Sequence, residues 1–146
     1  MAVRVAINGF GRIGRLVLRG ILESRRNDVE VVAINDLGSP EMNAHLLQYD
    51  STHGVLDMDV AVNGDVMNVG AAPIKVTAER NPADLPWKEL GVDIALECTG
   101  LFTDRESAGK HLDAGASKVL VSAPASGVDL TVVYGVNHDK LEAGHT

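Results

Sequence analysis

The sequence has few of the features that mark several large classes of protein. Its 146 residues include one cysteine, and only 3% of them are aromatic. Cys98 alone cannot form a disulfide within the chain, and no Cys-x-x-Cys pair or His/Cys cluster indicates a structural metal. A reducing compartment suits this composition best, and we expect a cytoplasmic protein without a metal site.

Basic charge and long apolar runs are also scarce. Lys and Arg number 13 against 20 Asp and Glu, which leaves a formal net charge of −7. Nucleic-acid binders typically carry a basic patch and aromatic stacking platforms, and an acidic membrane surface would repel this chain. No apolar stretch approaches the ~18 residues needed to span a bilayer. We therefore expect neither nucleic acid nor membrane as a partner.

The remaining composition is that of a folded domain. Hydrophobic residues make up 45% and charged residues 23%, close to the average for soluble proteins. A chain of this length can bury a substantial core, and no repeat, low-complexity tract or linker divides it. We expect one domain over residues 1–146.

The N-terminal third is patterned as strand, helix and strand. Residues 3–8 alternate apolar and polar side chains, as a strand does, and residues 29–35 are apolar nearly throughout, as in a strand buried on both faces. Between them, apolar residues recur at helical spacing up to about Arg25. Three arginines take the opposite face of this helix: Arg12, Arg15 and Arg19.

The pattern continues with alternating strands and helices. Ser39-Pro40 is a typical helix start, and Asn63-Gly64 predicts a hairpin within residues 56–78. Further elements are expected as strands at 92–98, 118–122 and 130–134 and a helix at about 104–114. This order predicts an α/β fold with a doubly wound, mostly parallel sheet and a small antiparallel hairpin insertion.

Gly9, Gly11 and Gly14 form a G-x-G-x-x-G motif between the first strand and the first helix. In a dinucleotide-binding Rossmann sheet the first glycine permits a tight turn, the second lets a pyrophosphate approach the backbone, and the third brings helix and strand together. The free amides of the first helical turn, including those of Arg12 and Ile13, then face the phosphates. The context therefore predicts a dinucleotide site.

Asp36 ends the second strand, where such folds recognise the adenosine ribose. A 2′-phosphate about 4 Å from its carboxylate would meet a gross repulsion of ~4 kcal/mol at an effective dielectric near 20. Even heavily discounted, this repulsion corresponds to at least one decade of preference. We predict NAD rather than NADP as the cofactor.

Several longer segments resemble one family. They are Ala6–Arg15, Ile34–Leu37, Leu47–Gly54, Glu97–Phe102 and Val121–Pro124. Together they are similar to the N-terminal NAD-binding domain of phosphorylating glyceraldehyde-3-phosphate dehydrogenases. The resemblance implies a homotetrameric, glycolytic enzyme that oxidatively phosphorylates glyceraldehyde 3-phosphate with NAD.

The same resemblance implies a set of cofactor contacts. The pyrophosphate segment matches at Asn8, Gly9, Gly11, Arg12 and Ile13, and the ribose ligand matches at Asp36 between Asn35 and Leu37. The adenine and nicotinamide surroundings match at Arg80, Thr99, Gly100, Phe102 and Ser122.

The family's chemistry needs a cysteine nucleophile and a histidine base, and neither family motif is present. Cys98 stands in Glu-Cys-Thr-Gly rather than in the family's Ser-Cys-Thr-Thr-Asn, so we interpret it as a small buried residue. His53 is interpreted as structural. The other histidines are interpreted as surface or helix-face residues: His45, His111, His138 and His145. We expect no catalytic residue here, a catalytic domain absent from the chain, and weak NAD binding without turnover.

Two alternatives stay open at this point. Erythrose-4-phosphate dehydrogenase shares the fold and much of the cofactor motif, because the substrate's length is sensed mostly outside this domain. The chain could also be a stand-alone nucleotide-binding or interaction module whose function lies in its surface.

Overall fold

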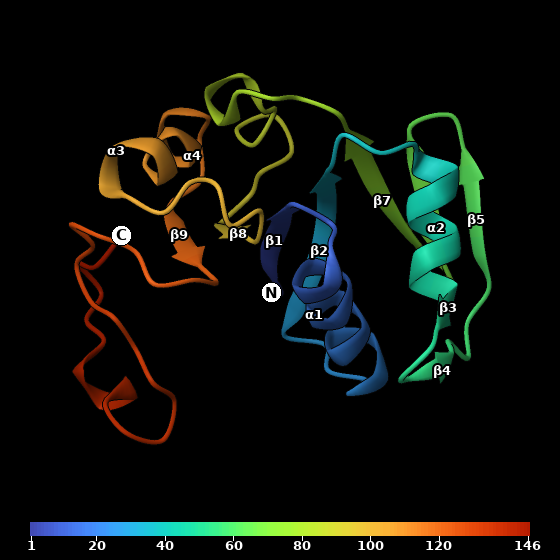
Figure 1. The fold of residues 1–146 in the computed structure, drawn as a ribbon, viewed down its shortest axis with the longest axis horizontal. Coiled ribbons are helices and arrows are strands. Elements are labelled where there is room, and N and C mark those ends of the chain that lie inside the picture. The colour runs from blue at the N-terminus through green and yellow to red at the C-terminus, as the bar shows by residue number, and fades with distance from the viewer.

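A seven-stranded sheet forms the centre of the computed structural model, which describes residues 1–146 (Figure 1). Its strands are β1 (Val3–Asn8), β2 (Val29–Asn35), β5 (Val60–Asn63), β6 (Val66–Val69), β7 (Ala72–Thr77), β8 (Ile94–Glu97) and β9 (Lys118–Val121). A separate two-stranded ribbon pairs β3 (Tyr49–Asp50) with β4 (Gly54–Val55).

Four α-helices and two single 3-10 turns complete the chain. They are α1 (Arg12–Glu23), α2 (Pro40–Gln48), η1 (Pro82–Asp84), α3 (Arg105–Ala108), α4 (Lys110–Asp113) and η2 (His138–Lys140). None of the helices is long and apolar enough to cross a membrane.

The strand order is β5-β6-β7-β2-β1-β8-β9. From β7 to β9 neighbouring strands are parallel, whereas β5, β6 and β7 pair antiparallel. The chain first moves from β1 outward to β2 and β7, and later returns to the other side of β1 with β8 and β9. Because the winding direction reverses between β1 and β8, the crevice at their carboxyl ends is where such sheets bind ligands.

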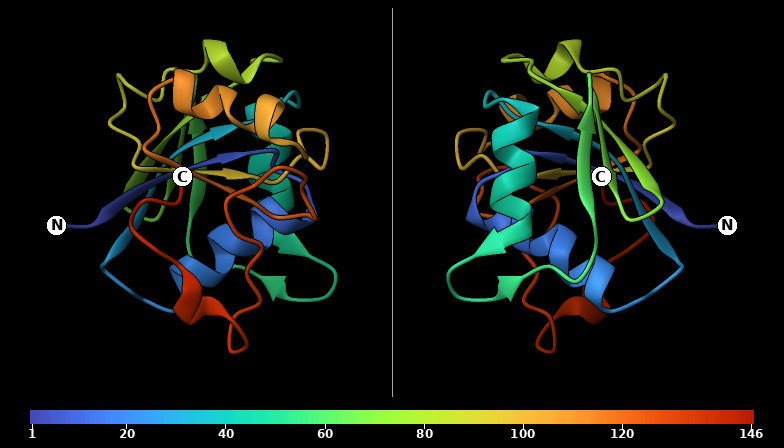
Figure 2. Two further views of the ribbon diagram at one scale, coloured as in Figure 1. Left: turned by 90° about the vertical axis from the view of Figure 1, so that its left-hand side faces the viewer. Right: turned by 90° about the vertical axis from the view of Figure 1, so that its right-hand side faces the viewer.

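Each face of the sheet buries its own apolar cluster, with helices on both sides (Figure 2). Ile7 and Ile34 pack with Leu18 of α1 on one face, whereas Ala33 and Ala95 pack with Trp87 on the other. Adjacent strand residues therefore serve opposite faces, as the period of a strand requires. The predicted doubly wound α/β class is confirmed.

Two local signals in the sequence correspond to the observed structure. The Ser39 hydroxyl accepts a hydrogen bond from the Met42 amide at 3.2 Å and caps α2, with Pro40 at the first helical position. The Asn63-Gly64 step joins β5 to β6, with Gly64 at φ +64°. The hairpin extends the main sheet rather than forming a layer of its own.

The helix expected at 104–114 is instead two single-turn helices, α3 and α4, separated at Gly109. A Cβ built on Gly109 would lie 2.6 Å from the carbonyl oxygen of Arg105. The Leu112 amide bonds the carbonyl of Gly109, three residues back, at 2.9 Å. The chain is wound more tightly here than in an α-helix, and glycine leaves room for the Arg105 carbonyl.

The prediction of a strand at 130–134 is wrong. No strand follows β9, and Val133 and Tyr134 are exposed. The Asn137 amide group instead donates to the Thr131 carbonyl at 2.9 Å and accepts from the Val133 amide at 2.7 Å. A local side chain thus occupies backbone groups that a neighbouring strand would have needed.

Arg19 does not take an exposed face of α1 as expected, because it is only 3% exposed. Its guanidinium donates to the backbone carbonyls of His53 and Gly54 at 3.0 and 2.8 Å, and to those of Leu47 and Gln48 at 3.2 Å. The β3–β4 ribbon folds over this arginine, which holds the ribbon against α1. Helical periodicity could not reveal a partner that lies more than twenty residues away.

Replacing Arg19 tests this role. Arg19→Met removes the donor to four buried or part-buried carbonyls, so we expect urea denaturation to show a loss of about 3 kcal/mol in unfolding free energy. Arg26→Met removes an exposed arginine paired with Asp28 and should change stability little. Equal effects of the two substitutions would show that Arg19 does not hold the ribbon.

Candidate functional site

A cleft opens at the carboxyl ends of β1, β2 and β8, where the winding of the sheet reverses. Its volume is about 380 Å³. Most of the predicted cofactor residues line it: Asn8, Gly9, Gly11, Asn35, Asp36, Leu37, Arg80, Thr99 and Phe102. Residues from four separate parts of the sequence are therefore brought to one crevice.

The glycine turn after β1 is closely packed on both sides. Gly9 has φ +90°, and a Cβ on it would lie 2.8 Å from the Thr99 amide nitrogen. A Cβ on Gly14 would lie 2.1 Å from the Gly9 carbonyl oxygen. Larger residues at these positions would push the turn away from the loop after β8 and lift α1 off the turn.

Gly11 and the start of α1 face open space. A Cβ on Gly11 would meet nothing within 4 Å, and no side chain caps the helix that begins at Arg12. Free first-turn amides and the positive end of the helix dipole suit an anion such as a diphosphate. The residues present therefore fit the phosphate portion of a dinucleotide.

Arg12 extends sideways from this helix end toward the β3–β4 ribbon. Its guanidinium lies 2.6 Å from a carboxylate oxygen of Asp50. The other Asp50 oxygen accepts the amides of His53 and Thr52, each at 2.8 Å. These two amides, aided by Arg12, lower the pKa of Asp50 to about 2. Asp50 thus offsets the unfavourable charge of an arginine at a helix N-terminus.

Asp36 joins the end of β2 to the glycine turn. One carboxylate oxygen accepts the Phe10 amide and the other accepts the Gly38 amide, both at 2.9 Å. Each oxygen has a further lone pair, so the carboxylate can also accept ribose hydroxyls.

Asn8 and Asn35 form part of the cleft floor, and both are almost fully buried. The Asn35 amide donates to the Asn8 side-chain oxygen at 2.7 Å and to the Glu79 carbonyl at 2.8 Å. Its own oxygen accepts the Thr77 hydroxyl at 2.7 Å and the Glu79 amide at 2.8 Å. These two asparagines tie neighbouring strand ends together.

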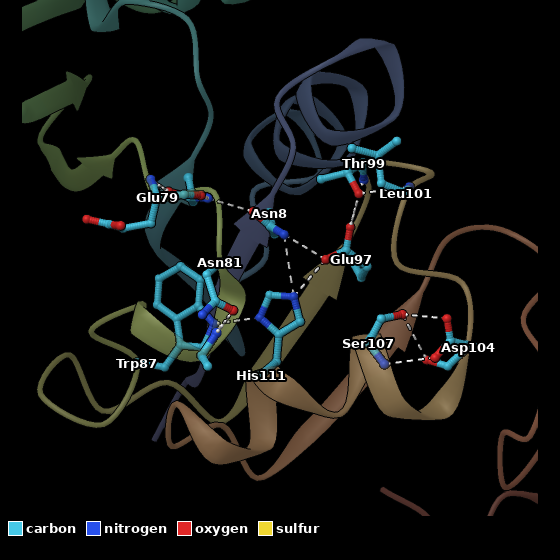
Figure 3. A network of polar contacts seen from close by, with 12 residues as sticks. Asn8, Glu79, Asn81, Trp87, Glu97, Thr99, Leu101, Asp104, Ser107 and His111 are labelled. Atoms are coloured by element: carbon cyan, nitrogen blue, oxygen red, sulfur yellow. Dashed lines mark hydrogen bonds and ion pairs between the residues drawn. The ribbon is translucent and has the colours of Figure 1, made fainter.

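The side-chain hydrogen bonds continue from Asn8 to Glu97 and His111 (Figure 3). Asn8 donates to a Glu97 carboxylate oxygen at 2.7 Å, and His111 contacts the same oxygen at 2.7 Å. Burial opposes ionisation of Glu97, but hydrogen bonds from His111, Thr99 and Asn8 outweigh it and hold the pKa of Glu97 below its ordinary value. A buried carboxylate therefore remains charged directly behind the cleft.

The other predicted residues lie beside the cleft rather than in its lining. Arg12 and Ile13 begin α1, Gly100 is in the loop after β8 at φ +73°, and Ser122 directly follows β9. Conversely, three lining residues were not predicted: Glu79, Cys98 and Leu101.

Cys98 lacks the surroundings of a nucleophile. Burial raises the pKa of its thiol, and nearby Glu97 acts in the same direction. The side chain is partly buried and packs against the apolar cluster around Ile7. No histidine lines the cleft.

Glu97 and His111 are the polar residues that the sequence did not reveal as parts of this region. His111 does lie on a helix face, but that face is buried and His111 is fully enclosed. The signal was present in the spacing, because Ala108 and Ala114 lie three residues to either side and are also buried. Glu97 ends a strand whose neighbouring residues are apolar, and its burial needed the donors that other elements supply.

Comparison with known proteins gives a family match. A family model described as "Glyceraldehyde 3-phosphate dehydrogenase, NAD binding domain" matches residues 3–105. Proteins named glyceraldehyde-3-phosphate dehydrogenase are similar over nearly the whole chain. One from Xanthobacter flavus is 69% identical over 145 residues, which cover 99% of this chain and 43% of that protein.

Two further relatives agree with this result. The protein from Cereibacter sphaeroides is 63% identical and that from Geobacillus stearothermophilus 57% identical. The two alignments cover 98% and 97% of this chain but only 42% of each relative. The chain thus spans less than half the length of these relatives. The family match confirms the prediction of NAD as the cofactor, whereas the individual contact residues remain predictions.

Two glycines of α1 provide a matched test of the turn. Gly14→Ala should reduce the unfolding free energy by roughly 3 kcal/mol, because its methyl group overlaps the Gly9 carbonyl. Gly20→Ala lies in the same helix with nothing within 4 Å and should be stabilising by about 0.5–1 kcal/mol. Urea denaturation of both variants makes the comparison, and equal stability would contradict the close packing at Gly14.

Proposed function

The chain belongs to the family of glyceraldehyde 3-phosphate dehydrogenase NAD-binding domains, and from that premise we propose that it binds NAD in the cleft between the turn after β1 and the loop after β8. The observation that carries this proposal is the meeting of an uncapped α1 N-terminus, a glycine turn and Asp36 around one crevice.

The phosphates would lie against Gly11 and the first-turn amides of α1. Gly11 leaves that approach open, and the N–H groups there have no side chain as a competing acceptor. This binding does not need a positive net charge, which the chain lacks. The partial charge of the helix end acts locally, within about one turn.

The adenosine ribose would bind at Asp36. The carboxylate is held by the amides of Phe10 and Gly38, so it is already oriented before a ligand arrives. Its negative charge accepts hydroxyl groups and repels a 2′-phosphate. Leu37 and Phe102 would provide apolar contacts near the adenine, and Arg80 also lines the cleft.

In the whole enzyme we propose the NAD-dependent oxidative phosphorylation of glyceraldehyde 3-phosphate, in glycolysis, by a cytoplasmic homotetramer. The relatives' names support glyceraldehyde 3-phosphate over erythrose 4-phosphate as the substrate. Bound NAD supplies a hydride acceptor, and the residues of this chain bind and orient it. The thiol and the base would belong to the remainder of the enzyme, since the environment of Cys98 raises its pKa.

Cofactor preference tests the role of Asp36. Calorimetric titration should give a Kd for NAD at least about tenfold lower than for NADP. Asp36→Asn removes the charge but keeps the size of the side chain. It should therefore reduce the ratio of the Kd for NADP to the Kd for NAD, even if it weakens the binding of both. Equal Kd values for NAD and NADP in the unmodified chain would disprove the ribose assignment.

The absence of turnover tests the assignment of the chemistry. We expect no NADH absorbance when the chain is mixed with NAD, glyceraldehyde 3-phosphate and phosphate, because neither a family nucleophile nor its base is present. A full-length relative under the same conditions serves as the positive control. Turnover that Cys98→Ser abolishes would show that the assignment of the nucleophile is wrong.

A further inference from the structure

A line of hydrogen bonds runs from the buried Trp87 to the loop at the cleft (Figure 3). The Trp87 indole donates to Nδ1 of His111 at 2.9 Å, and Nε2 of His111 lies 2.7 Å from Glu97. Glu97 in turn accepts the amide of Thr99 at 2.9 Å and the Thr99 hydroxyl. The Thr99 hydroxyl oxygen accepts the Leu101 amide at 3.1 Å.

Trp87 determines the direction of the hydrogen bonds made by His111. An indole can only donate, so Nδ1 of His111 is the acceptor and its proton is on Nε2, pointing at Glu97. Asn8 also donates its amide to Glu97. Three N–H groups, from Asn8, His111 and the Thr99 backbone, therefore point at the carboxylate, which favours its ionised form.

Trp87, His111 and Glu97 are at most 1% exposed, and none of them lines the cleft. Burying a charge is costly unless donors surround it, and an apolar set of similar volume is often at least as stable. Stability alone therefore does not require an ionised group at this position. Its partner Thr99, however, does line the cleft.

The loop that Glu97 holds lies directly against the glycine turn. Thr99 leaves no room for a Cβ on Gly9, and Gly100 follows at φ +73°. The bonds from Thr99 to Glu97 and from Leu101 to Thr99 set the path of this loop. A small shift of the loop would change the width of the cleft at the phosphate end.

We propose that Glu97 and His111 are positioning residues for NAD, which hold the Thr99–Phe102 wall of the cleft at the spacing the cofactor needs. The inference rests on the proposed NAD binding. Its distinctive consequence is that NAD binding in the cleft changes the environment of the Trp87 indole through His111.

The chain contains one tryptophan, so its ¹⁵N-labelled form has one indole N–H signal. We expect this signal to shift on titration with NAD, with the same Kd that calorimetry measures. A merely structural network would leave the signal unmoved. An unmoved signal at saturating NAD overturns the positioning role while leaving NAD binding intact, and failure of the unmodified chain to bind NAD overturns both.

Two pairs of variants test the same role by affinity. His111→Leu removes the donor to Glu97 and should raise the Kd for NAD about tenfold, whereas His111→Gln restores an N–H donor and should stay within about threefold. Thr99→Val loses the hydroxyl that joins Glu97 to Leu101 and should bind more weakly than Thr99→Ser, which keeps it. Calorimetric stoichiometry separates a misfolded fraction from a weakened affinity.

The threonine pair keeps the test decisive if His111→Leu does not fold. A folded His111→Leu variant with unchanged Kd, or equal affinities for Thr99→Val and Thr99→Ser, overturns the proposal. The expected pattern is a loss in the Leu and Val variants and recovery in the Gln and Ser variants.

Discussion

The ionised carboxylate of Glu97 is the point on which the architecture around the cleft depends. Directly and through Asn8 and His111, it joins the ends of β1 and β2 to α4 and to the segment that carries Trp87. A charge in this position requires several donors, and they come from β1, from α4 and from the loop after β8. The elements are therefore held in one relative arrangement, more precisely than apolar packing alone requires.

Close backbone approach is the second constraint on the crevice. Gly9 and Gly14 let the turn after β1, the start of α1 and the loop after β8 lie against one another without side chains between them. The free amides at the start of α1 then face the space above Gly11. This local geometry explains how a chain with a net charge of −7 can offer an anion site.

Much of the fold could be predicted because its signals are local. The strand-helix-strand start, the Ser39 cap and the hairpin at Asn63-Gly64 each depend on residues within a few positions of one another. The errors arose where composition and periodicity do not show which hydrogen-bond partners a segment finds. Residues 130–134 have strand-like composition but no neighbouring strand, and Asn137 takes their backbone groups. A tight turn at Gly109 divides the helix expected at 104–114, and periodicity does not record such a turn.

The sequence by itself determined the class of fold, the position of the glycine turn and the nature of the cofactor. The spacing of glycines and apolar residues is enough for the fold class and the turn, and the negative charge of Asp36 at the end of the second strand indicated NAD. Only the tertiary structure decided that Arg19 and His111 are buried, and that Glu97 serves the cleft from behind it. Burial of a polar side chain depends on donors and acceptors from distant segments, and these meet only once the sheet has formed.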